Sequence, residues 1–90
     1  MKTPSFTNQF EKDMKLSEKR GKDLTKIKAV MFDIICENPL PPKNNDHPLV
    51  GNYKGHRECH IEPNWLLIYL YQGNEVKFVR NGTHSDLFEK

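Results

Sequence analysis

Residues 56–62, with the sequence HRECHIE, place two histidines, a cysteine and two glutamates close together in the chain. Such side chains can bind a metal ion, transfer protons or form the solvated face of a strand. In an extended strand His56, Glu58 and His60 share one face, whereas Cys59 lies on the other. The segment lacks the helical HExxH spacing, and no second histidine and cysteine cluster has zinc-finger spacing. The pattern therefore disfavours a metal site, and it leaves proton transfer or a polar strand face.

The composition predicts one globular domain that spans residues 1–90. Of the 90 residues, 36% are hydrophobic and 29% are charged, and a chain of this length has room for one modest core. The longest apolar run, residues 65–71, is too short to cross a bilayer, and the N-terminus lacks the apolar stretch of a secretory signal. We therefore expect a cytoplasmic protein that does not contact the membrane, with Cys36 and Cys59 as free thiols.

Basic residues are concentrated in the first third of the chain. Residues 1–30 hold eight Lys and Arg against four Asp and Glu, a balance of +4, whereas residues 31–90 hold six against eight, a balance of −2. These balances sum to the net charge of +2. A cationic segment can lie against phosphates, but a charge pattern of this kind is more often the solvated faces of two amphipathic helices.

Two helices are expected in the first 38 residues. Apolar residues recur every four positions from Phe6 to Met14, which predicts a short amphipathic helix that ends near Gly21. A wide apolar stripe within residues 24–35 predicts a second helix, and Asn38 before a proline ends it. The expected N-caps are Thr7 for the first helix and Asp23 or Thr25 for the second.

The second half of the chain has the pattern of a sheet. Residues 38–52 are rich in proline and asparagine and are expected to form a loop. Three strand candidates follow, and their connections are so short that neighbouring strands must be antiparallel. These candidates are residues 57–62, 65–71 and 75–80. We predict an α+β fold in which the N-terminal helical hairpin packs on one face of a small antiparallel sheet. The other face, to which His60 points, is expected to be open.

Two longer segments carry a family resemblance. DHPLVGNYKGHRECHIEPNWLLIY, which begins at residue 46, and VRNGTHSDLF, which ends at residue 88, together resemble the YafQ-type branch of the RelE/ParE superfamily of bacterial toxins. The resemblance implies a RelE-like fold with a further edge strand near residues 2–6, which gives three to four strands. It also implies a toxin of a type II toxin–antitoxin system, which cuts messenger RNA on the ribosome without a metal or another cofactor.

The resemblance assigns roles to particular residues. Those it implies for catalysis are His47, His60, Asn64, Arg80, His84 and Phe88, and those it implies for substrate binding are Lys54, Arg57 and Trp65. Cleavage of RNA at its own 2′-hydroxyl needs a base, an acid for the leaving 5′-oxygen and a cation beside the phosphorane, and it yields a 2′,3′-cyclic phosphate. Arg80 is the expected cation and His84 the expected acid, while His60 or His47 would be the base.

Two of the aromatic residues in this set have a simpler interpretation. Phe88 could stack on a base or orient the His84 ring, and Trp65 could contact the substrate. Taken alone, however, large aromatic side chains are more often part of the core than of a substrate site.

Position 64 departs from the family pattern, which usually has aspartate where this chain has Asn64. An amide cannot hold a proton at neutral pH, and it cannot stabilise an imidazolium by charge. Either the role of base has moved to a histidine, or the chain is an attenuated variant.

The alternative function is that of a non-catalytic member of the superfamily. Such a protein would poison another target by binding it, as gyrase-directed relatives do, or would serve as a co-repressor bound to its antitoxin. Three histidines around an arginine favour the nuclease, because a gyrase-type inhibitor has no use for them. The partners implied for the nuclease are a cognate antitoxin, messenger RNA in the ribosomal A site and ribosomal RNA. The antitoxin would bind the basic helices or the open sheet face.

Overall fold

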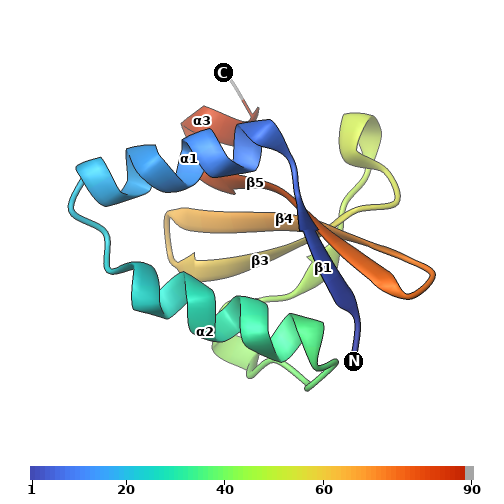
Figure 1. Cartoon of the computed structure of the whole chain (residues 1–90). Helices are drawn as coiled ribbons and strands as arrows, with labels where there is room; N and C mark the ends of the chain where they lie inside the picture. Colours follow the sequence, from blue (N-terminus) through green and yellow to red (C-terminus); the bar gives the residue numbers. More distant parts are fainter. Residues whose placement is uncertain (89–90) are drawn as a thin grey trace.

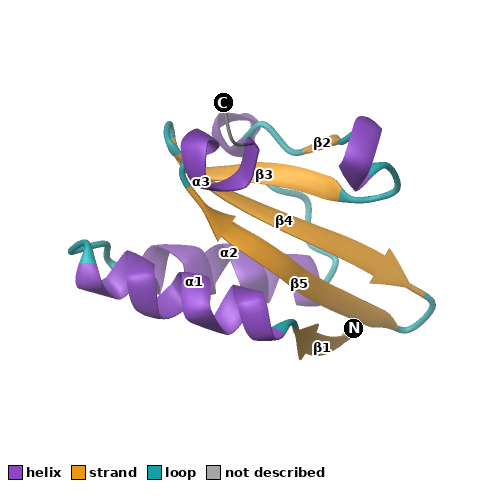
Figure 2. Cartoon of the chain, turned by 90° about the horizontal axis from the view of Figure 1, so that it is seen from above, coloured by secondary structure: helices purple, strands orange, loops and turns teal. Residues whose placement is uncertain are grey.

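The structure is a computed structural model that describes residues 1–88. Two long helices lie on one side of a five-stranded sheet, and a short third helix lies on the other side (Figures 1 and 2). The elements are β1 (Thr3–Phe6), α1 (Asn8–Lys19), α2 (Leu24–Ile35), β2 (His47–Pro48), β3 (Arg57–Glu62), β4 (Trp65–Gln72), β5 (Glu75–Gly82) and α3 (His84–Phe88), with short 3-10 helices η1 (Pro42–Asn44) and η2 (Gly51–Tyr53). No helix in this described part of the chain is long and apolar enough to cross a membrane.

The two N-terminal helices begin at capping residues that the sequence indicated. Thr7 Oγ1 accepts a hydrogen bond from Phe10 N at 2.9 Å, and Asp23 Oδ1 accepts one from Thr25 N at 3.0 Å. Each bond satisfies a backbone N–H that has no partner within its own helix. Gly21, with a φ of +85°, makes the turn between the helices, where a side chain would be strained.

The main core lies between these helices and the sheet. Its largest buried side chains are Trp65, Tyr69, Phe10 and Phe78, joined by Ile27 and Ile34 of α2. Each such side chain contributes roughly 1.5–3 kcal/mol when it is removed from water. Cys59 also lies here, and its burial raises the pKa of the thiol to about 12. It therefore stays protonated and is unreactive at neutral pH.

The opposite sheet face is only partly open, which corrects the expectation from the sequence. Leu66, Ile68 and Leu87 form a second small core, against which Leu49, Tyr53, Val79 and Phe88 pack. Figure 2 shows α3 and the segment around η2 above this face. The cause is β4, whose residues are apolar on both faces and so need cover on both. We call the part of this sheet face around Glu58, His60 and Arg80 the site face.

The sheet is mixed and has two more strands than the sequence pattern alone predicts. β1 pairs in parallel with β5, from Thr3 opposite Glu75 to Phe6 opposite Phe78, and this pairing confirms the edge strand that the resemblance implies. β2 forms within the segment that was expected to be a loop, and it pairs with β3 so that His47 lies opposite Glu58. The remaining pairs are antiparallel, and the sheet order is β1-β5-β4-β3-β2.

A β-bulge in β5 sets the direction of Arg80. Phe78 pairs with Tyr69 and faces the helices, and strict alternation would make Arg80 face them too. The register shifts between Ile68 and Tyr69, so Val79 is an extra residue and Arg80 pairs with Ile68. Cross-strand partners share a face, and Ile68 belongs to the second core. The bulge therefore turns Arg80 toward the site face.

The start of α3 is fixed by a capping box and an ion pair. Thr83 N donates to Asp86 Oδ2 at 3.0 Å, and Asp86 N donates to Thr83 Oγ1 at 3.1 Å. Asp86 also accepts from Arg20 at the end of α1, with 2.7 Å between Nη1 and Oδ2. The Arg20 guanidinium and the Thr83 N–H lower the pKa of Asp86 to about 2. The ionised carboxylate thus anchors the helix that carries His84.

We expect this carboxylate to make stability depend on acid. An unfolded aspartate has a pKa of about 3.9, and the pKa of Asp86 in the folded protein is lower, at about 2. The ionised carboxylate therefore stabilises the fold fully above about pH 3.9, and this stabilisation is lost as the pH falls toward about 2. In Asp86→Asn the free energy of unfolding should be lower than in the wild type by about 1–2 kcal/mol near neutral pH. Urea unfolding at several pH values measures this difference, and it should shrink between about pH 4 and pH 2. A difference that stays constant across this range would contradict the assignment.

Candidate active site

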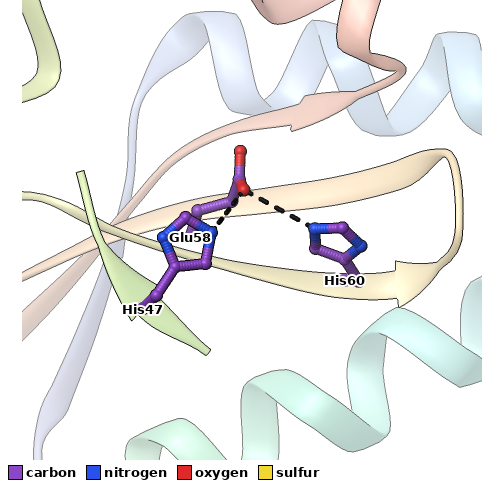
Figure 3. Close-up of side chains that lie close together, drawn as sticks. All are labelled: His47, Glu58 and His60. Atoms are coloured by element: carbon purple, nitrogen blue, oxygen red, sulfur yellow. Dashed lines mark hydrogen bonds and ion pairs between the residues drawn. The ribbon is translucent and has the colours of Figure 1, made fainter. Parts of the chain in front are cut away.

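A buried carboxylate lies between two histidines on the site face. Glu58 on β3 is 5% exposed, and its Oε1 lies 2.9 Å from His47 Nε2 and 3.6 Å from His60 Nε2 (Figure 3). His47 comes from β2, and His60 lies one strand repeat beyond Glu58, so both rings reach the same carboxylate. A charge this deeply buried needs such partners, because an unpaired carboxylate would be costly.

Both ring nitrogens of His47 are engaged in the structure. Its Nε2 lies 2.9 Å from Glu58 Oε1, and its Nδ1 lies 3.0 Å from the carbonyl oxygen of Pro48. Neither nitrogen is free to take the proton of a 2′-hydroxyl. His60 is therefore the better candidate for the base.

A third histidine approaches from the start of α3. The rings of His60 and His84 are 5.9 Å apart between centroids and nearly perpendicular. Asn64 Oδ1 accepts from the backbone N–H of His84 at 3.0 Å and lies 2.7 Å from its Nδ1. The amide therefore orients the ring so that Nε2 is free. His60 and His84 are close enough to act on one phosphodiester.

Arg80 is held by Asp13 at the edge of β5. Its Nε and Nη2 donate to the Asp13 carboxylate at 2.8 and 3.2 Å, and the neighbouring Asn81 N donates to the same carboxylate at 3.1 Å. Asp13 raises the pKa of Arg80, chiefly through the side-chain hydrogen bond, and Tyr53 adds a smaller effect in the same direction. The guanidinium is therefore permanently charged and fixed in place.

A comparison with known proteins decides the family. The family model described as "Bacterial toxin of type II toxin-antitoxin system, YafQ" matches residues 2–89. The chain belongs to the YafQ family of bacterial toxins. The mRNA interferase toxin YafQ of Escherichia coli strain K12 is 45% identical over 84 residues, which cover 92% of this chain and 91% of that protein.

Solved structures of two bacterial toxins have the same fold. The crystal structure of the E. coli DinJ-YafQ complex matches with a TM-score of 0.91 and 43% identity, over 98% of this chain and 99% of that one. A metal-bound toxin from Helicobacter pylori matches with a TM-score of 0.92 and 42% identity, over 98% and 100%. The RelE-like α+β fold implied by the resemblance is thus confirmed.

The structure gathers most of the residues that the YafQ resemblance implied for catalysis. His47, His60 and His84 lie on or beside the site face, Asn64 contacts His84, and Arg80 reaches this face through the bulge. Phe88 follows His84 by one turn of α3, and its ring packs edge-on against Tyr53 at 6.0 Å between centroids. Phe88 is partly buried in the second core, so it helps to hold α3 on the sheet.

The predicted substrate contacts fit less well. Trp65 is 1% exposed within the main core, and its Nε1 donates to Asn81 Oδ1 at 3.3 Å, so the prediction that it touches the substrate is wrong. Arg57 forms an ion pair with Asp46 on the helix-covered side of the sheet, which points it away from His60. Strand alternation explains this error, because neighbours one residue apart face opposite sides. Lys54 is exposed in the connection between η2 and β3, where it remains a candidate phosphate contact.

Two acidic residues of the site were missed. The sequence indicated Glu58 only as a possible metal ligand, although its alternation with His60 places both side chains on one face. Asp13 lies among the lysines of α1, but it also lies three residues after Phe10 and four before Ser17, both of which are buried. That helical spacing is the signal that could have identified an inward-facing carboxylate.

The site also contains a group that could hold a metal ion. One ligand atom from each of His47, Glu58 and His60 lies within 4.8 Å of the others. Two imidazoles and a carboxylate suit zinc or copper. The spacing within residues 56–62 indicated His56 as the second histidine, whereas β2 brings His47 to Glu58 instead. The ligand types therefore fit a transition metal better than the sequence indicated.

Proposed function

We propose that this YafQ-family toxin is an endoribonuclease that cleaves messenger RNA on the ribosome and is neutralised by a cognate antitoxin in the cytoplasm. The observation that carries the proposal is the pair of imidazoles 5.9 Å apart on the sheet face toward which the bulge turns Arg80. The E. coli relative is named an mRNA interferase toxin, and DinJ-YafQ structures show that relative in a toxin–antitoxin complex.

The proposed reaction uses the nucleophile that RNA itself carries. The His60–Glu58 pair takes the proton of the 2′-hydroxyl, and the 2′-oxygen then attacks the adjacent phosphorus. The bond from phosphorus to the 5′-oxygen breaks, and His84 gives that oxygen a proton through Nε2. The products are a 2′,3′-cyclic phosphate and a 5′-hydroxyl. A correctly placed acid and base each contribute roughly 10²–10⁴-fold to such a rate.

Positive charge beside the phosphate supplies the remaining stabilisation. Arg80 stays charged and presents N–H groups at fixed positions. This charge favours the dianionic phosphorane over the singly charged diester, which is the requirement for catalysis. Lys54 is a further candidate contact for flanking phosphates.

A hollow next to His60 gives room for a flanking nucleotide. It has a volume of about 510 Å³ and is lined by Lys43, Asn44, His60, Ile61, Glu62 and Pro63. Lys43 supplies a cation there, and Ile61 with Pro63 supplies an apolar wall. Lys43 could contact a flanking phosphate, and the apolar wall could contact the face of a base.

Asn64→Asp should raise the rate of cleavage. Asn64 Oδ1 accepts from His84 Nδ1 at 2.7 Å, and a carboxylate of nearly the same size can keep this bond. The added negative charge favours the imidazolium form of His84, which is the form that can donate a proton from Nε2. We expect cleavage to be about tenfold faster, with its pH optimum shifted upward. Single-turnover cleavage measured between about pH 5 and pH 9 tests this.

The matched control for this variant is Asn44→Asp. Asn44 lies beside the site and is buried, whereas Asn64 is exposed. The Nδ2 of Asn44 donates to the carbonyl oxygen of His60 at 2.7 Å, so a carboxylate there has the wrong polarity. The rate should therefore not rise in the control. A rate for Asn64→Asp that equals or falls below that of the wild type would argue against a tuning role for position 64.

The decisive test of the proposed function is a primer-extension map of transcripts in cells that express the chain. We expect new 5′ ends within translated regions, and we expect them to disappear when translation is blocked or the antitoxin is co-expressed. Growth arrest without such ends would favour the non-catalytic alternative. For the purified protein, cleavage that requires a metal ion and is abolished by EDTA would instead assign the His47, Glu58 and His60 group to metal-dependent chemistry.

A further inference from the structure

The Asp13 carboxylate is the most completely bonded acidic group of α1. It is 6% exposed, and four N–H donors surround it. Oδ1 accepts from Gln9 Nε2 at 3.1 Å and from Arg80 Nη2 at 3.2 Å, and Oδ2 accepts from Arg80 Nε at 2.8 Å and from Asn81 N at 3.1 Å. Both oxygens are therefore occupied, and the group has little freedom to move.

The location of Asp13 explains why one side chain can hold both neighbours in β5. β1 pairs with β5 only as far as Phe78. From residue 79 onward, this edge of β5 has no pairing with β1. α1 follows β1 directly and runs along this edge, where Asp13 takes the backbone N–H of Asn81 in place of a strand. The same carboxylate reaches Arg80, whose direction the bulge has already set.

The two bonds to Arg80 determine which donors face the substrate. A guanidinium has five N–H groups in one plane, and Asp13 binds the edge formed by Nε and Nη2. Three N–H groups remain, two on Nη1 and one on Nη2, and the Tyr53 hydroxyl is a further neighbour of the guanidinium. One N–H of each Nη forms the end-on fork that matches two oxygens of a phosphate. The bonds from Nε and Nη2 to Asp13 fix the plane of the guanidinium. They therefore also fix the position of the edge formed by Nη1 and Nη2.

We propose that Asp13 is a positioning residue for cleavage, which aims the free edge of Arg80 at the phosphorane. The proposal rests on the proposed function and assigns no contact between Asp13 and RNA. Under this proposal α1 contributes to catalysis although it lies outside the cluster of histidines. The position of α1 sets the position of Asp13, and Asp13 sets the orientation of the Arg80 guanidinium.

The negative charge of Asp13 gives this role a distinctive signature. A carboxylate next to Arg80 weakens the attraction of the guanidinium for any phosphate, so its removal should strengthen or preserve RNA binding. The same removal frees the side chain to rotate, so fewer bound complexes have the geometry that stabilises the phosphorane. Binding and cleavage should therefore change in opposite directions, which simple loss of folding cannot produce.

The test compares Asp13→Asn with wild type and with Glu11→Gln, which removes the same charge from an exposed position of the same helix. Single-turnover cleavage of translated messenger RNA should be about 10–100-fold slower in Asp13→Asn, and binding to ribosomes programmed with that RNA should be equal or tighter. In a nitrogen-15 spectrum, the Arg80 Nε–H signal should exchange slowly with water in wild type and quickly in Asp13→Asn. Glu11→Gln should match wild type in all three measurements.

Several outcomes would overturn the proposal. One is a folded Asp13→Asn protein that cleaves at the wild-type rate, and another is equal losses of binding and cleavage. If Asp13→Asn does not fold, Asp13→Glu takes its place, since it retains the charge but moves the carboxylate; wild-type cleavage by that variant would also overturn the proposal. A wild-type chain that cuts no RNA refutes the proposed function instead, and the Arg80 spectrum then still shows whether Asp13 fixes the guanidinium.

Discussion

Replacement of His84 by alanine is expected to slow RNA cleavage by roughly 10²–10⁴-fold, the contribution of one well-placed general acid. His84 is exposed at the start of α3, so its truncation leaves no cavity and should change the free energy of unfolding by less than about 0.5 kcal/mol. The backbone N–H of residue 84 can still donate to Asn64, which keeps the helix in place. A lost rate in a fully folded protein would identify a chemical role.

Two measurements separate this role from a general disturbance. The wild-type rate should fall at high pH as the acid loses its proton, and the alanine variant should lack this fall. Added imidazole should restore part of the lost activity, because the ring position is open to solvent. The control is His56→Ala, since His56 contacts Tyr53 at 5.7 Å between ring centroids and lies outside the cluster. Equal effects of the two substitutions would refute the assignment of His84.

Arg80→Lys is expected to reduce cleavage by about 10²-fold, although the charge is retained. An ammonium cannot offer two forked edges, so it cannot bind both Asp13 and a phosphate in the fixed geometry of the guanidinium. Lysine is preferable to alanine for this test. Alanine would leave Asp13, which is 6% exposed, without its main counter-charge and would destabilise the fold.

Arg57→Lys provides the matched control for this substitution. Arg57 is paired with Asp46 through Nε at 3.2 Å, so the chemical change is the same, but this pair lies on the helix-covered side of the sheet. Single-turnover cleavage should therefore be nearly unchanged in Arg57→Lys. A hundredfold loss there as well would mean that the two arginines act through the general electrostatic field and not through placement.

The fold was predictable where local patterns carry it. The helices, their capping residues Thr7 and Asp23 and the three antiparallel strands follow from periodicity and turn chemistry, and the structure confirms them. β1 was expected only through the family resemblance, because its pairing with β5 joins residues at opposite ends of the chain. β2 was missed, since two residues carry no periodicity from which to recognise a strand.

The candidate site shows a similar division. The family motif placed the histidines, Arg80 and Asn64 together. In the structure the three histidines and Asn64 adjoin one another through Glu58 and the His84 ring, and the bulge turns Arg80 toward the same face of the sheet. It did not indicate that Glu58 and Asp13 would be buried, because burial depends on which segments pack over a residue and not on the residue itself. Trp65 was misassigned for the same reason, since motif membership does not distinguish a core residue from a substrate contact.

The parallel pairing of β1 with β5 has a consequence for the order in which the protein is made. Asp13 and Arg80 are 67 positions apart, and the first strand has no partner until β5 has emerged from the ribosome. Synthesis is vectorial, so an incomplete nascent chain lacks both the edge that receives β1 and the helix that bears His84. The toxin therefore completes its sheet and its candidate site only after the end of the chain has left the exit tunnel.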